Sequence, residues 1–135
     1  CSLAHIAAHG TFRVDNPMFS SLGLHDGPLT VHDIERLGRA PHRILLPCCD
    51  SAVGAPAGAD ELLGLVSSFM ALGTVGVVGA IVPVSDEETA DLMIALHEAL
   101  RAGMPLAEAL LEAREKTSDG PVAIATGLSF LAFGS

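Results

Sequence analysis

Apolar runs and helical patterns alternate along the chain and predict an α/β domain. Short apolar runs predict buried strands over residues 3–8, 43–48, 75–82 and roughly 125–133. Helical spacing predicts helices over residues 30–38, 60–72, 85–102 and 105–117, while the stretch 10–29 is rich in turn residues and predicts a loop. Because helices join consecutive buried strands, we expect a three-layer α/β/α fold around a mostly parallel sheet.

Several residues mark where the predicted helices begin and end. Thr30 is a suitable N-cap, with Asp33 in the first turn, and Ser85 forms the pattern of a capping box with the glutamate three residues later. Gly73 and Gly103 follow the last helical positions of two helices, where glycine commonly ends a helix. These signals fix the expected helix boundaries independently of the apolar pattern.

Length and charge narrow the possible functions. The 135 residues fit one domain, 1–135, and 16 acidic against 7 basic residues give a net charge of −9. So few basic residues disfavour a nucleic-acid partner. Residues 62–84 are uncharged, but glycines, serines and a proline interrupt the run, so we interpret it as a buried helix and strand rather than a membrane span. Three cysteines, two of them adjacent, exclude a disulfide framework and suit a reducing compartment.

The ends of the predicted strands carry the candidate chemistry, since ligands of parallel sheets bind beyond the carboxyl ends of the strands. The loops there begin with His9-Gly10, Cys49-Asp50 and Ser85-Asp86. A histidine near a cysteine can generate or stabilise the reactive thiolate. The alternative is that Cys49 is a small buried hydrophobe and His9 a hydrogen-bonded loop residue, and spacing alone favours this alternative.

The sequence resembles the CHAT-domain family of caspase-like cysteine peptidases, relatives of separase, caspases and gingipains, over nearly the whole chain. Residues 5–10 (HIAAHG) resemble its histidine motif, and residues 45–50 (LLPCCD) resemble its nucleophile motif. Residues 82–86 (VPVSD) resemble the Trp-Pro-Val-Asp-Asp stretch of the family. Further ordered matches lie at residues 16–22, 26–30, 60–65, 69–73, 92–93 and 106–110. The resemblance implies a caspase-like fold and peptide-bond hydrolysis without a cofactor.

Carried over to this chain, the resemblance implies a role for each residue at the strand ends. Cys49 is then the nucleophile and His9 its base or ion-pair partner. The backbone N–H groups of Gly10 and Cys49 form the oxyanion hole. Asp86 falls where separase-like relatives receive a basic side chain before the cut bond, and Asp50 is a further candidate for that pocket. As an alternative, Asp86 is a first-turn acid stabilised by the helix dipole.

Departures from the family pattern leave a rival function open. Pro47, Val82 and Ala80 stand where the family has serine, tryptophan and often serine. An inactive CHAT-like interaction or signalling module is therefore the alternative, and a redox switch built on Cys48 and Cys49 is a third.

The resemblance also implies a partner and a compartment. The family domain has further N-terminal strands, so we expect this chain to be the C-terminal catalytic portion, with an N-terminal segment or a second copy covering the sheet edge. A cytoplasmic, bacterial protein is expected from the resemblance.

His5 and His9 have the spacing of a helical zinc pair but lie in a predicted strand, so we expect no metal. The remaining histidines, at 25, 32, 42 and 97, are interpreted as surface residues.

Overall fold

The structure, a computed structural model, describes residues 2–11, 16, 19–47 and 58–135. In these residues the elements are β1 (Leu3–His5), β2 (His9–Thr11), β3 (Ser21–Leu24), β4 (Gly27–Thr30), α1 (Val31–Arg36), β5 (Arg43–Leu46), α2 (Gly58–Ala71), β6 (Gly76–Ala80), α3 (Asp86–Arg101), α4 (Leu106–Lys116), α5 (Pro121–Ser129) and β7 (Phe130–Gly134).

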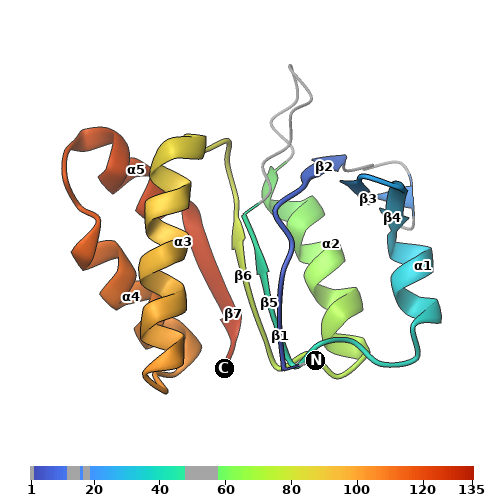
Figure 1. Cartoon of the computed structure of the whole chain (residues 1–135). Helices are drawn as coiled ribbons and strands as arrows, with labels where there is room; N and C mark the ends of the chain where they lie inside the picture. Colours follow the sequence, from blue (N-terminus) through green and yellow to red (C-terminus); the bar gives the residue numbers. More distant parts are fainter. Residues whose placement is uncertain (1, 12–15, 17–18, 48–57) are drawn as a thin grey trace.

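The main sheet has four strands in the order β1-β5-β6-β7 (Figure 1). The first three are parallel, and β7 runs antiparallel to β6. A separate antiparallel sheet, β2-β3-β4, lies beside the carboxyl ends of these strands. The predicted α/β fold with a mostly parallel sheet is confirmed.

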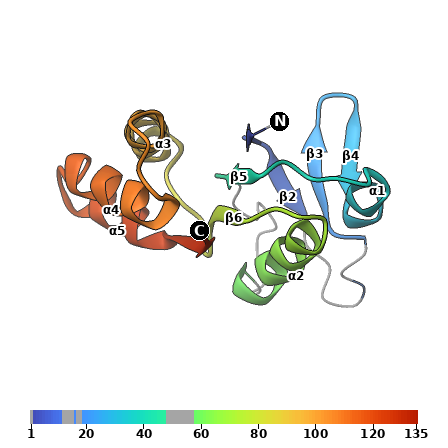
Figure 2. The same ribbon diagram turned by 90° about the horizontal axis from the view of Figure 1, so that it is seen from below.

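Helices cover both faces of the main sheet, with α3, α4 and α5 on one face and α1 and α2 on the other (Figure 2). Side chains alternate between the faces of a strand, and β5 shows this directly. Leu45 packs with the α3 and α4 side, whereas Ile44 and Leu46 pack with the α1 and α2 side. All three are fully buried, so β5 holds the two apolar layers together.

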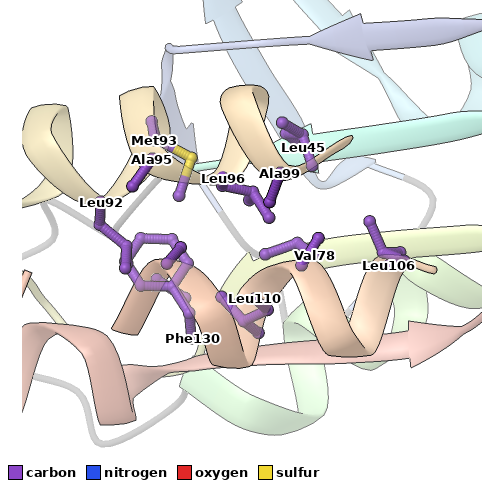
Figure 3. Packing of buried hydrophobic residues seen from close by; sticks show 13 residues of the cluster. Leu45, Val78, Leu92, Met93, Ala95, Leu96, Ala99, Leu106, Leu110 and Phe130 are labelled. Carbon is purple, nitrogen blue, oxygen red and sulfur yellow. The ribbon is translucent and has the colours of Figure 1, made fainter. Parts of the chain in front are cut away.

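The cluster on the α3 face is built from residues of α3, α4 and the strands of the main sheet (Figure 3). Leu96 of α3, Leu110 of α4 and Phe130 of β7 meet Leu45 and Val78 of the sheet. Each of these side chains is at most 2% exposed. Burial of this apolar surface, at roughly 25 cal/mol per Å², is the main force holding α3 and α4 against the strands.

The helix-boundary predictions are confirmed with one exception. The Thr30 hydroxyl accepts the Asp33 N–H at 3.1 Å, while the Asp33 carboxylate accepts the Thr30 N–H at 3.1 Å. Gly73 and Gly103 follow their helices with φ of 97° and 90°, values that favour glycine. Ser85 is the N-cap of α3 but makes no side-chain cap hydrogen bond, so the predicted capping box is wrong. Three acids in that first turn complement the helix dipole instead.

The stretch 10–29 is not the predicted loop, because it contains most of the small antiparallel sheet. His9 pairs with Gly23, and Leu22 pairs with both Gly10 and Leu29. His25 and Asp26 form the β3–β4 turn, and Gly27, the first residue of β4, has a φ of 135°, which favours glycine. The turn residues that indicate a loop in the sequence thus connect two short strands instead.

The two ends of the chain also differ from the predictions. Residues 125–129 belong to α5, and β7 starts only at Phe130. The helical period is hidden because Val122, Ile124 and Leu128 are apolar yet exposed. At the other end, β1 stops at His5, and residues 6–8 lead into β2. Within the described chain, no helix is both long and apolar enough to cross a membrane.

Candidate active site

Three chain segments leave the carboxyl ends of β1, β5 and β6 at one end of the sheet (Figure 1). The strands are parallel and in register, with His5 opposite Leu45 and Leu45 opposite Val78. The segment after β1 leads to His9, the segment after β5 begins with Pro47, and the segment after β6 leads to Asp86. The topology therefore brings His9, Pro47 and Asp86 to the same end of the sheet.

The small antiparallel sheet holds His9 and Gly10. His9 is the first residue of β2 and its side chain is exposed, whereas Gly10 is buried. Gly10 pairs with Leu22, which is fully buried among the side chains of α1 and α2. This anchoring fixes the backbone around His9 while its imidazole stays exposed to solvent.

Cys48, Cys49 and Asp50 lie outside the described residues. The proposed nucleophile, its contribution to the oxyanion hole and the second candidate acid therefore remain predictions from sequence. Pro47, the neighbouring described residue, is half-buried at the end of β5.

Asp86 borders a groove between the end of the sheet and α3. It is the first residue of α3 and is exposed. The groove has a volume of about 490 Å³, and Ala7, Pro47 and Ile94 line it together with Asp86. Ala7 lies two residues before His9, and Pro47 lies two residues before Cys49. The groove thus contacts all three strand-end segments, although His9 is not among the described residues that line it.

A pair of histidines forms the floor of the same groove. His5 Nδ1 lies 2.9 Å from His97 Nε2, and the ring centroids are 5.0 Å apart. Partial burial lowers the pKa of His5, and the nearby His97 lowers it further. These two causes favour the neutral imidazole of His5.

His97 corrects the expectation of a surface histidine, because it is half-buried. It follows the buried Thr89 and Met93 at intervals of four residues along α3. That spacing was the available signal, since residues four apart lie on the same helix face. His9, in contrast, belongs to a different sheet from His5. Among the described residues no group of three or more potential ligands could hold a metal ion.

The family model of the CHAT domain matches residues 2–123. This range includes His9, Gly10, Cys49, Asp50 and Asp86. A search of the curated proteins found no match.

Proposed function

Since this chain belongs to the CHAT-domain family, a caspase-like peptidase family, we propose that it is a cysteine endopeptidase. Cys49 is the nucleophile in this proposal, and His9 is the base or ion-pair partner. The backbone N–H groups of Gly10 and Cys49 stabilise the oxyanion. The protein or peptide substrate is cleaved without a cofactor.

The register of β1 and β5 is the observation that carries this proposal. His5 and Leu45 are opposite each other in the parallel pair, and the His5 side chain shares a sheet face with Leu45. His9 and Cys49 each follow that pair by four residues. Two strands that leave the sheet side by side can thus supply a base and a thiol to one substrate.

The reaction follows from these groups. The Cys49 thiolate attacks the carbonyl carbon of the peptide bond, and the carbonyl oxygen becomes an oxyanion held by backbone N–H groups. The C–N bond then breaks, and the departing amine takes a proton from the His9 imidazolium. Water, losing a proton to His9, attacks the thioester, and cleavage of the C–S bond returns Cys49 and releases the new carboxylate.

Asp86 supports a preference for a basic side chain before the cut bond. Its exposed carboxylate borders the groove that Ala7 and Pro47 also line, so a side chain entering from the cleavage site reaches it. A guanidinium can make a bidentate, charge-assisted contact with such a carboxylate. Asp50 is the second acid proposed for this role.

The edge strand β1 supports the proposal of a partner strand. β1 is at one end of the main sheet, and an edge strand can pair with a further strand. The partner is an N-terminal chain segment or a second copy. A light-scattering mass equal to that of a single, well-folded chain would contradict a second copy.

Active-site labelling tests the peptidase proposal. The protein is treated with an arginyl chloromethylketone, and the adduct is located by mass spectrometry. We expect labelling of Cys49 that is lost in His9→Ala and kept in His25→Ala, which removes an exposed histidine from the β3–β4 turn of the same small sheet. Cys48→Ala should leave labelling unchanged.

Two other results would contradict the assignment. An adduct on Cys48 would show that the motif is out of register by one residue. If no adduct forms and no peptide is cleaved, the protein is not a peptidase, and the interaction module becomes the better explanation.

A further inference from the structure

A basic pocket lies at the amino end of the main sheet, opposite the candidate active site. It has a volume of about 310 Å³ and lies between the start of β1, the start of β5 and the last turns of α3. Arg43 and Arg101 line it together with His42 and His97. No acidic residue of the described chain lines this pocket, which is unusual in a protein with a net charge of −9.

Arg43 is fixed in the wall of the pocket by the sheet. It pairs in register with Leu3 of β1 and Gly76 of β6. It lies two residues before Leu45, so both side chains are on the α3 face of β5. The Nε–H of Arg43 is buried and finds no acceptor in the described chain. A buried donor without a partner is costly, and this one belongs to an arginine that lines the pocket.

Two other basic residues in the C-terminal half of the chain have partners within the fold. Lys116 forms an ion pair with Glu112 at 3.2 Å, and Arg114 donates to the carbonyl oxygen of Gly127 at 2.9 Å and to that of Phe130. Arg101, in the last turn of α3, has no such ion pair or hydrogen bond among the residues that the structure describes. Two arginines for which the described residues show no ion pair therefore line one pocket in a chain with 16 acidic residues.

We propose that this pocket binds an oxyanion, a carboxylate or phosphate group carried by a small molecule, between Arg43 and Arg101. Guanidinium groups are suited to this role, because their planar N–H donors match the oxygens of carboxylate and phosphate. Arg43 and Arg101 both line the pocket, so both arginines can hold one oxyanion there. The limited volume and the apolar wall formed by Leu3 and Leu100 admit a small ligand. The site does not depend on the proposed peptidase activity.

Calorimetric titration of the whole chain tests this site. Inorganic phosphate and succinate are titrated separately at low ionic strength in a buffer without competing oxyanions. We expect saturable binding of at least one of them, with one site per chain. A response to phosphate alone or to succinate alone identifies which oxyanion the pocket prefers, and either supports the site.

Arg101→Gln is the decisive variant, because Arg101 is exposed and its loss leaves the core intact. We expect affinity to fall about tenfold or more, as is usual for loss of a charge-assisted hydrogen bond. Arg36→Gln is the matched control, since Arg36 is an exposed arginine in the last turn of α1 and does not line the pocket. The control should bind with wild-type affinity. Arg43→Gln should also lose binding, once thermal melting has shown that it folds.

Two outcomes overturn the proposal. One is the absence of saturable binding of either anion up to about 10 mM. The other is an equal loss of affinity in Arg101→Gln and Arg36→Gln, which would show that the anion responds to net charge and not to this pocket.

Discussion

The two ends of the main sheet share the same elements but differ in charge. Both the groove at the carboxyl end and the pocket at the amino end are lined by parts of β1, β5 and α3 with their flanking residues. Asp86 lies at the first end and Arg101 at the second. Because α3 runs opposite to β1 and β5, its N-terminus is next to their carboxyl ends (Figure 1).

A helix dipole favours acidic residues at the start of the helix and basic residues at its end. In α3 this preference places negative charge at the carboxyl end of the main sheet and positive charge at its amino end. α3 carries Asp86, Glu87 and Glu88 in its first turn and Arg101 in its last. In this fold a local rule of helix stability gives the candidate active site an acidic border and the opposite pocket a basic one. The following predictions test how independent the two ends are.

The largest effect on stability is expected from Leu45→Ala, which alters the apolar cluster between the main sheet and α3. Leu45 is fully buried between β1, β6 and α3, so the substitution should lower the free energy of unfolding by about 2–5 kcal/mol. Denaturant unfolding measures it. Leu63→Ala is the control, because Leu63 is an exposed leucine of α2 and should change stability by less than about 0.5 kcal/mol. A small effect of Leu45→Ala would mean that the two ends do not share one core.

Two glycines of β6 allow the ends to be compared directly. A Cβ at Gly76, near the amino end, would lie 2.6 Å from the Ser135 carbonyl oxygen and from Leu106 Cδ2. We expect Gly76→Ala to lower the free energy of unfolding by about 1–3 kcal/mol, because the backbone at Ser135 must move. At Gly79 the nearest atoms belong to the Leu62 side chain, at 3.0 Å, which can shift more easily. Thermal melting should show a smaller loss for Gly79→Ala, and the reverse order would contradict this packing.

A change confined to the carboxyl end is Asp86→Asn. If Asp86 receives a basic side chain, kcat/KM for arginyl peptides should fall about tenfold or more, while cleavage of other peptides changes little. Anion binding at the opposite pocket should not change. Glu87→Gln removes the same charge from the next residue, which is exposed and does not line the groove. Equal effects of the two variants would indicate general electrostatic attraction instead of a specific contact.

The smallest expected effect concerns the His5–His97 pair, which lies between the two ends. The pKa of His5 is lowered from 6.5 by burial and by His97, so the unfolded chain binds more protons as the pH falls below 6.5. Stability should therefore decrease on acidification, over the interval between the unfolded and the lower folded pKa. Urea unfolding at about pH 7.5 and about pH 5 should show a smaller loss in His5→Asn than in the wild type. His32→Asn, at an exposed position of α1, should behave like the wild type.

Local signals in the sequence predicted the elements whose boundaries depend on one or two residues. Thr30, Gly73 and Gly103 mark helix ends correctly, because caps and positive φ angles are set locally. The same logic failed for Ser85, whose side chain makes no cap bond. α5 was mistaken for a strand because its exposed residues are apolar, and periodicity cannot separate strand from helix in such a run.

The candidate site was predictable only in part, for a similar reason. The rule for parallel sheets selected the carboxyl ends of the strands, and the structure brings the segments that lead to His9 and Asp86 to that end. It could not select His97 or Arg43, because their importance arises from contacts between distant elements. His5 meets His97 across 92 residues of sequence, and Arg43 lines its pocket with Arg101. Helical spacing indicates the buried face on which His97 lies, but tertiary packing alone brings it to His5 and brings Arg43 to Arg101.

The register of the main sheet has a consequence for the order of folding. One row of paired residues crosses the sheet through Leu3, Arg43, Gly76 and Gly134, so every strand pairing closes a long loop of chain. Such loops are slow to close, whereas the β3–β4 hairpin and the α3–α4 pair join neighbouring segments and can form early. We therefore expect the pocket at the amino end to be assembled late, when the row is complete. An anion held between Arg43 and Arg101 would bind only the finished sheet and would slow its unfolding.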